Sequence, residues 1–271
     1  MGRYVILAMA VACASLGLAQ TVTVQPSTVP GVEITAPGAP DYAVSVDQVL
    51  PPPRSGALNA WLPYGVALRN STQQNILGVA LRWSAVMANG ATESGTSMSL
   101  TQTPSHQIAP GQVAVALPNF GEVLVQGDAS RLPARLRLNP PAESAADPDV
   151  NLAHYQTART VEVVLDGVVF ASGQFMGPDT ANEYEKWLAD TTVPGEIGAK
   201  VLAMKAAGES TGSIVAWLEQ AARSEGSTDE AADMRGRVAH RLLQTYRQQG
   251  EAALYQHAQA GSPLASLHLY R

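Results

Sequence analysis

The character of the chain changes near residue 178, and this change restricts the fold to a β region followed by helices. Before residue 178 there is no lysine, and Val, Leu, Thr, Gly and Pro are frequent, whereas Lys, Ala and Glu become common beyond it. Strands followed by helices along a chain are typical of the α+β class. We therefore expect an antiparallel β-sandwich over residues 56–178 and a tail of about four α-helices over residues 179–271.

Period-two alternation of apolar side chains is the evidence for strands in the β region. The clearest case is residues 76–90, "ILGVALRWSAVMANG", in which Leu77, Val79, Leu81 and Trp83 alternate with small or polar residues. Shorter segments of the same kind cover residues 64–70, 97–103 and 112–118. They are separated by turn sequences, "NSTQQN" at residues 70–75 and Pro110-Gly111.

Asp166 and Gly167 interrupt the β-branched segment "VEVVLDGVVF" at residues 161–170. Asp-Gly between two such runs is the preferred sequence of a type I′ hairpin, because both central residues need a positive φ. The hairpin would place Leu165 opposite Val168 and give both arms one shared apolar face. We therefore expect Asp166 to be a turn residue and not a catalytic carboxylate.

Residues 1–19 have the pattern of a secretory signal peptide. Arg3 precedes an apolar run, and the small residues Gly17 and Ala19 mark a cleavage site before Gln20. The run is shorter than the roughly 20 residues that a membrane span requires. We expect a secreted or periplasmic mature chain without a transmembrane segment.

Cys13 is the chain's one cysteine and lies inside the expected signal. The mature chain would then have no disulfide, cysteine nucleophile or thiolate metal site. Residues 10–13, "AVAC", also loosely match a lipoprotein processing box, in which Cys13 becomes the lipidated N-terminus. A lipid-anchored accessory protein is therefore an alternative, although Ala10 stands where leucine is usual.

Two further segments of the β region are expected to lack regular structure. Residues 20–55 form a leader rich in Pro and Gly, with weak strand candidates at "VEITA" and "YAVSVDQVL", and we expect it to be partly extended and partly disordered. Residues 139–152, "NPPAESAADPDVNL", are expected to form a long polar loop.

A family resemblance agrees with the expected sandwich. From Tyr64 to Ala116, "LRNSTQQNILGVALRW", Gly90 and "IAPGQVAVA" resemble the Ig-like accessory sandwiches of secreted bacterial proteins. The segment "DGVVFASGQFMGPD" and the helical tail are similar to uncharacterised secreted proteins of acidobacteria. The resemblance implies an antiparallel Ig-like β-sandwich followed by a C-terminal α-helical region, and it implies no chemistry.

Helical spacing of apolar residues divides the tail into four expected helices. The first runs from Thr180, paired with Glu183 in a capping box, to about residue 190, with Tyr184, Trp187 and Leu188 as its buried side. The second spans about residues 194–207, and the third carries Ile214, Trp217, Leu218 and Ala221. The fourth begins at Ser227, paired with Glu230, and continues with Ala231, Met234, Val238, Leu242 and Tyr246.

The sharpest chemical motif is "GESTG" at residues 208–212, which matches the G-x-S-x-G nucleophile elbow around Ser210. Potential triad partners follow it in an allowed order: Asp229, Asp233, His240, His257 and His268. An elbow requires a buried strand before the serine, whereas the residues before Ser210 are helical in pattern. We expect Gly208 to end one helix and Ser210 or Thr211 to cap the next, and we keep a Ser210 hydrolase as the alternative.

The remaining polar residues form no chemical constellation. The histidines, including His106 and His154, have no HExxH spacing, and the Asp147 and Asp149 segment lacks the glycine of a calcium loop. The residues Arg235, Arg237, Arg241 and Arg247 are expected to form a salt-bridged solvent face, with Asp233 four residues before Arg237. The sequon Asn70-Ser71-Thr72 is expected to occupy a turn. We assign no catalytic, cofactor or metal residue.

Net charge and motif content together restrict the classes of binding partner that we expect. Without the signal the chain carries 16 basic and 23 acidic residues, a net charge of −7 with His neutral. A helix-turn-helix pattern around Gly208 has no basic residue between Ser213 and Gln220, so nucleic acid is not expected. We expect an exported non-catalytic binding protein or envelope scaffold, whose partner is an unknown protein or a cell-envelope polymer.

Overall fold

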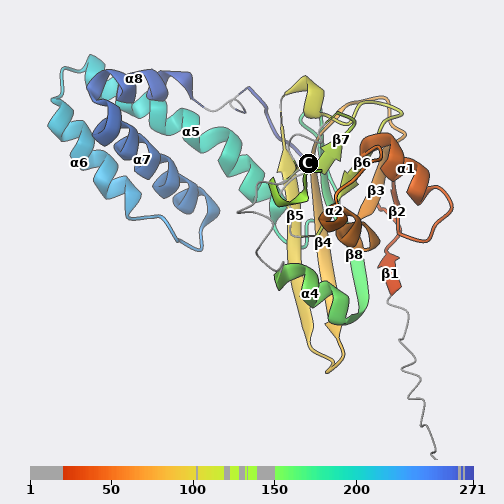
Figure 1. The fold of residues 1–271 in the computed structure, drawn as a ribbon. Coiled ribbons are helices and arrows are strands. Elements are labelled where there is room, and N and C mark those ends of the chain that lie inside the picture. Colours follow the sequence, from red (N-terminus) through yellow and green to blue (C-terminus); the bar gives the residue numbers. More distant parts are fainter. Residues whose placement is uncertain are drawn as a thin grey trace, which may run out of the picture.

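The computed structural model describes residues 21–101, 103–118, 123–127, 132, 134–138, 150–261, 264 and 266–271. The expected signal, its cleavage site and Cys13 lie outside these residues, as do Asp147 and Asp149. The protein is of mixed α+β class, with a β region followed by helices (Figure 1). None of the helices in the described part of the chain combines the length and apolar content of a membrane span.

The first sheet has the strand order β1-β8-β4-β5, with β9 paired to β8. Its strands are β1 (Thr21–Val24), β4 (Ile76–Met87), β5 (Thr92–Leu100), β8 (Ala158–Phe170) and β9 (Phe175–Met176). Its pairs are antiparallel except β1 with β8, which is parallel. The long strands β4 and β8 form its centre.

The second sheet is antiparallel and has the order β2-β3-β6-β7. Its strands are β2 (Val32–Thr35), β3 (Val66–Asn70), β6 (Val113–Ala116) and β7 (Val123–Val125). Short helices complete this part of the chain: α1 (Tyr42–Val49), α2 (Gly56–Trp61), η1 (Leu62–Tyr64), η2 (Pro104–His106), η4 (Ala134–Leu136) and α4 (Val150–Thr157). We call residues 21–176 the sheet lobe.

The two sheets bury their apolar side chains in one common core. Leu68 of β3, Leu81 and Trp83 of β4 and Val163 of β8 belong to the same buried cluster. Strands predicted from residues 64–70, 76–90 and 112–118 are confirmed as β3, β4 and β6, whereas the strand expected at 97–103 overlaps only the end of β5, which runs from Thr92 to Leu100. The Pro110-Gly111 turn is also confirmed, because the Gln112 amide donates to the Ala109 carbonyl at 3.0 Å.

The predicted Asp166-Gly167 hairpin is wrong, because β8 continues straight through both residues. Gly167 pairs with Ala80 and Leu165 with Leu81, so Asp166 is an extra residue in a β-bulge. The bulge shifts the alternation by one residue, and the expected apolar set still faces one core: Val161, Val163, Leu165, Val168 and Phe170. A hairpin and a bulge thus give the same pattern, and the twelve-residue β4 selects the bulge by pairing along β8.

The leader at residues 20–55 is not a separate disordered segment where the structure describes it. The "VEITA" segment forms β2 as predicted, and β1 joins the other sheet beside β8. "YAVSVDQVL" forms the helix α1 instead of a strand, with Tyr42, Val46 and Val49 buried. Positions i, i+4 and i+7 lie on one helical face, and the Tyr42 hydroxyl anchors α1 by donating to the Leu62 carbonyl at 2.6 Å.

The tail contains α5 (Glu183–Ala206), α6 (Thr211–Ala222), α7 (Glu230–Gln249) and α8 (Glu251–Ala260). The two helices expected over residues 180–207 are one helix, α5, which continues through Pro194. Neither expected capping box forms, because Asn182 precedes α5 and Asp229 caps α7. The helix α8 had not been expected.

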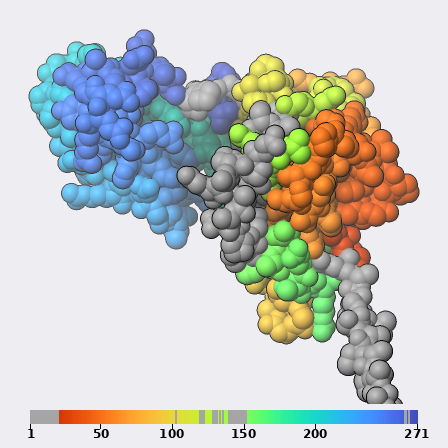
Figure 2. Space-filling view, viewed as in Figure 1, coloured from red at the N-terminus to blue at the C-terminus, as the bar shows by residue number. Residues whose placement is uncertain are grey.

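The helices α5 to α8 enclose a second core, whose buried residues run from Ala189 of α5 to Ala258 of α8. We call this part of the chain the helical lobe. Figure 2 shows the blue helical lobe and the orange to green sheet lobe on opposite sides of the view. The first turns of α5 belong instead to a third cluster on the outer face of the first sheet, with Trp187 beside Phe175 and Leu267. The helix α5 is therefore the connection between the lobes (Figure 1).

Candidate functional site

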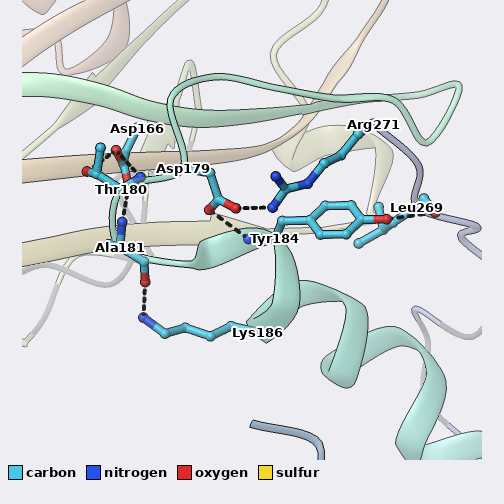
Figure 3. Close-up of polar contacts among 8 residues, drawn as sticks. All are labelled: Asp166, Asp179, Thr180, Ala181, Tyr184, Lys186, Leu269 and Arg271. Carbon is cyan, nitrogen blue, oxygen red and sulfur yellow. Dashed lines mark hydrogen bonds and ion pairs between the residues drawn. The ribbon is translucent and has the colours of Figure 1, made fainter. Parts of the chain in front are cut away.

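The place where β8, the start of α5 and residues 266–271 meet contains most of the buried charge, and we call it the junction (Figure 3). Asp166 is fully buried there, at the bulge of β8. One carboxylate oxygen accepts from the Thr180 amide at 3.0 Å and hydroxyl at 2.6 Å, and the other accepts from the Ala181 amide at 2.8 Å. Asp166 is therefore a buried anchor for the segment before α5, because these donors compensate its burial.

The segment from Gly177 to Asn182 is shaped around that anchor. The Asp179 amide donates to the Asp166 carbonyl at 2.8 Å, and Asp179 and Asn182 both have positive φ, 54° and 56°. Gly177 passes so close to β8 that an added Cβ would lie 2.5 Å from the Asp166 carbonyl oxygen. This close fit uses Thr180 to bind Asp166, which is why Thr180 does not cap α5 as the sequence suggested.

Asp179 is the second buried carboxylate of the junction, with a side chain 4% exposed. Its Oδ1 accepts from the Tyr184 amide at 3.1 Å, which provides the start of α5 with an acceptor. Its Oδ2 forms an ion pair with the guanidinium of Arg271 (Figure 3). Asp179 therefore connects the first turn of α5 to the segment that returns from the helical lobe.

Aromatic rings support this ion pair. The Arg271 guanidinium carbon lies 4.5 Å from the centre of the Tyr184 ring, and the Tyr184 hydroxyl donates to the Leu269 carbonyl at 3.4 Å. The centre of the Phe175 ring lies 5.4 Å from the centre of the Tyr184 ring and 5.9 Å from that of Trp187. The charged and aromatic contacts thus combine on one side of α5.

Backbone hydrogen bonds also hold the returning segment on the sheet lobe. The Phe175 amide donates to the Tyr270 carbonyl at 2.7 Å, and the Tyr270 amide donates to the Gly173 carbonyl at 3.0 Å. Leu267 is buried in the cluster that contains Trp187. The chain therefore leaves the sheet lobe through α5 and comes back to it at residues 266–271.

Glu183 is the third acidic residue of the junction, and it is fully buried. Its Oε1 accepts from the Lys186 ammonium at 3.0 Å, and Oε2 has no partner among the described residues. Burial raises the pKa of the Glu183 carboxyl; Lys186 opposes this shift, and the nearby carboxylates of Asp166 and Asp179 add to it. For the Glu183 carboxyl, burial therefore outweighs the contact with Lys186.

The junction holds together β8, the start of α5 and residues 266–271, and its aspartate carboxylates are not free to react. The carboxylates of Asp166 and Asp179 are occupied by amides, a hydroxyl and a guanidinium. Within the described residues, no group of three or more His, Cys, Asp or Glu side chains is placed to hold a metal ion. Its chemical capacity is to fix the direction in which α5 leaves the sheet lobe.

Ser210 stands between the helices α5 and α6, whereas a nucleophile elbow requires a strand before the serine. Its Oγ accepts from the Ser213 amide at 3.1 Å, so Ser210 is the N-cap that the sequence predicted. Gly208 ends α5 with φ +77°, and the amides of Gly208 and Glu209 donate to carbonyls of the last turn at 3.0 and 3.1 Å. This Schellman arrangement confirms the helix-to-helix turn.

The potential triad partners of Ser210 have other contacts. Asp229 caps α7 through the Ala232 amide at 2.7 Å, and His240 lies 3.2 Å from a carboxylate oxygen of Glu225. His257 Nδ1 lies 3.2 Å from the Thr245 hydroxyl. Asp233 forms the expected ion pair with Arg237, at 2.9 Å. The structure does not bring any of these side chains to Ser210 through a described contact.

The remaining sequence candidates are dispersed. His154 lies 3.0 Å from Glu93 on the surface of the sheet lobe, whereas His268 lies in the returning segment. Asn70 of the sequon is fully buried, and its amide donates to the Ile108 carbonyl at 2.7 Å. Asn70 is thus a structural anchor between β3 and the loop before β6.

Sequence reasoning missed the junction, although one local signal pointed to it. The last residues, "LHLYR", alternate apolar and polar side chains, and Leu267 and Leu269 do face the sheet lobe while His268 and Tyr270 are exposed. The pairing of Asp166 with Thr180 and of Asp179 with Arg271 has no signal of that kind. Comparison with known proteins finds no matching protein family and no significant similarity to a curated protein or to a solved structure.

Proposed function

We propose that the protein is an exported, non-catalytic binding protein or envelope scaffold that holds two lobes in one fixed arrangement. The observation that carries the proposal is the double connection at the junction. The helix α5 leaves the sheet lobe beside Asp166 and Asp179, and residues 266–271 return to the same place through Arg271. Two anchored connections restrict the relative motion of the lobes far more than one flexible linker does.

A fixed arrangement of the two lobes favours binding. A partner that contacts both lobes then binds without the entropy cost of ordering them. The helical lobe is joined to the sheet lobe through a buried cluster that contains Trp187 and Phe175. Its exposed ion pairs, such as Arg247 with Glu219 at 3.2 Å, leave a polar surface on α6 and α7. The partner in this proposal is an unknown protein or a cell-envelope polymer.

The finer features of the sequence analysis belong to the same proposal. The sheet lobe is an Ig-like accessory sandwich, supported by two sheets that share one core. The chain is a member of the uncharacterised secreted acidobacterial proteins that it resembles, exported to the periplasm or the exterior after cleavage near Ala19 and Gln20. Acidic net charge, −6 for the whole chain, disfavours nucleic acid as the partner.

A photo-crosslinking experiment in the producing cells tests the scaffold proposal. A photoreactive residue replaces Val44 on α1, which is 68% exposed, or the exposed Arg235 on α7. We expect both positions to capture the same envelope component. A double variant, Asp179→Asn with Arg271→Gln, should lose joint capture while each lobe stays folded by circular dichroism. Capture from neither position would contradict the proposal.

A serine-reactive fluorophosphonate probe tests the hydrolase alternative on the same preparation. Because Ser210 Oγ is engaged with Ser213, we expect no labelling of the wild-type protein. Labelling that disappears in Ser210→Ala but persists in Ser213→Ala would replace the scaffold proposal with a hydrolase.

Mass spectrometry of the mature N-terminus tests export and the lipid-anchored alternative. We expect a chain that begins at Gln20. An acylated chain that begins at Cys13, with precursor accumulation under globomycin, would identify a lipoprotein instead.

A further inference from the structure

A cavity of about 330 Å³ lies inside the helical lobe, between α5, α7 and α8. This volume is at the lower end of the range for small-molecule sites, about 300–1,000 Å³. Pro194 and Gly198 of α5 form one wall, and α7 forms the other with Val238, Arg241, Leu242 and Thr245. Pro194 and Gly198 are four residues apart and therefore lie on the same face of α5.

The cavity has a local structural cause. An added Cβ on Gly198 would lie 2.3 Å from the Ala258 carbonyl oxygen, so α5 and α8 are in close contact at this point. One turn earlier, Pro194 lines the cavity with its ring instead of a long side chain. The helices are pressed together at Gly198 and leave space beside Pro194.

The lining combines an apolar base with a polar rim. Val238, Leu242 and Ala258 are buried, whereas Arg241 and His257 are exposed. Thr245 is 8% exposed, and its hydroxyl lies 3.2 Å from His257 Nδ1. When Thr245 donates to Nδ1, the imidazole carries its proton on Nε2, which gives the lining a second donor in addition to Arg241.

Arg241 has charge available for a ligand. Its neighbours on α7 and α5 include Arg237 and Asp190, but within the described residues Arg241 forms no ion pair of 4 Å or less. Burial raises the pKa of the Asp190 carboxyl, while Arg237 and Arg241 oppose the shift and Glu230 adds to it.

We propose that this cavity binds a small amphipathic carboxylate, whose alkyl chain lies against Val238 and Leu242 and whose carboxylate is held by Arg241. Charge complementarity selects the occupant, because a guanidinium on the rim of an apolar pocket matches a carboxylate on an alkyl chain. The site does not depend on the scaffold role, because it lies wholly within the helical lobe.

Calorimetric titration of the full chain with octanoate tests the site, with octanol as the uncharged probe. We expect wild-type protein to bind octanoate with a Kd below about 1 mM and Arg241→Gln to bind it at least about tenfold more weakly, because one charge-assisted hydrogen bond is lost. The control Arg235→Gln removes an exposed arginine of α7 that does not line the cavity, and it should bind like wild type. Octanol should bind all three proteins equally.

Three outcomes would overturn the site. The first is no octanoate binding by the wild-type protein, and the second is equal weakening by both arginine substitutions, which indicates surface adsorption only. The third comes from methyl NMR of the free protein. If the Val238 and Leu242 methyl groups show contacts with another segment of the chain, that segment fills the cavity and no ligand site exists.

Discussion

The two lobes differ in the sequence distance over which their contacts form. In the sheet lobe, β1 pairs with β8, and a Thr23 hydroxyl reaches the Val161 carbonyl across 138 positions. In the helical lobe, α7 packs against α5, α6 and α8, and α5 also packs against α8. The sheet lobe therefore depends on segments from opposite ends of the chain, whereas the helical lobe forms its contacts within one continuous stretch from α5 to α8. The junction connects these two kinds of structure through α5.

Replacement of Trp187 is expected to destabilise the protein most, because Trp187 is 1% exposed and packs between α5 and the first sheet. Trp187→Ala should lower the free energy of unfolding by about 3–5 kcal/mol. Urea unfolding followed by circular dichroism measures it. The control Trp217→Ala lies at a partly buried position in the helical lobe and should cost less. Equal losses would show that α5 does not depend on the sheet for its anchorage.

Removal of the Asp166 carboxylate should be the next largest effect. In Asp166→Ala the amides of Thr180 and Ala181 lose their buried acceptor, at a cost of about 2–3 kcal/mol. Hydrogen exchange should show faster exchange at residues 180–184 and unchanged exchange in α7. Thr180→Val removes only one donor and should cost about 1 kcal/mol. If α7 exchanges faster as well, the two lobes unfold together.

A glycine pair in α5 separates packing from helix propensity inside the helical lobe. Gly198→Ala should destabilise the protein by about 1–3 kcal/mol, because the methyl group would collide with the α8 backbone at Ala258. Gly195→Ala has open space and should stabilise the protein by up to about 1 kcal/mol through helix propensity. Thermal unfolding monitored on both variants measures the pair. Destabilisation by both would mean that the contact of Gly198 with α8 does not explain the effect of Gly198→Ala.

The smallest effect should come from Glu183 and should be a gain in stability. Because burial raises its pKa, the folded chain binds a proton more readily than the unfolded chain, and the charged carboxylate costs stability at neutral pH. Glu183→Gln should raise the free energy of unfolding at pH 7 by less than about 1 kcal/mol. The gain should shrink as the pH falls through the raised pKa of Glu183 in the folded chain, and it should be gone below the ordinary pKa of glutamate.

The matched control for that substitution is Glu185→Gln, which changes an exposed residue in the same turn of α5. Its stability difference from wild type should stay within about 0.5 kcal/mol. A loss of stability in Glu183→Gln at pH 7 would show that the ion pair with Lys186 outweighs the burial of the carboxyl.

Whether an element could be predicted depends on how far apart in the sequence the residues lie whose contacts determine it. The strands β3 and β4 were predictable because the alternation of large apolar side chains with small or polar ones is a local property of a strand. The cap at Ser210 and the stop at Gly208 were predictable because each involves only neighbouring residues. Helix α5 was divided wrongly, because a second helix was expected to begin at about Pro194, whereas buried contacts at Val193 and Ile197 keep one helix continuous there.

The junction shows where sequence reasoning ends. Asp166 was read from its Asp-Gly neighbourhood as a turn residue, and both the turn and the bulge satisfy the same apolar pattern. Its partners Thr180 and Ala181 lie 14 and 15 positions away, and Arg271 lies 92 positions from Asp179. No periodicity within a strand or helix encodes such pairs.

By itself the sequence determined the α+β class, the order of strands before helices, the main strands and the helix-to-helix turn at Gly208, while it left the cap open between Ser210 and Thr211. Each of these follows from spacing or capping within a few residues. Only the tertiary structure decided that Asp166 is buried, that α5 is continuous and that residues 266–271 return to the first sheet. These features depend on which distant segments share a surface, and the free energy of that choice comes from packing and hydrogen bonds between segments.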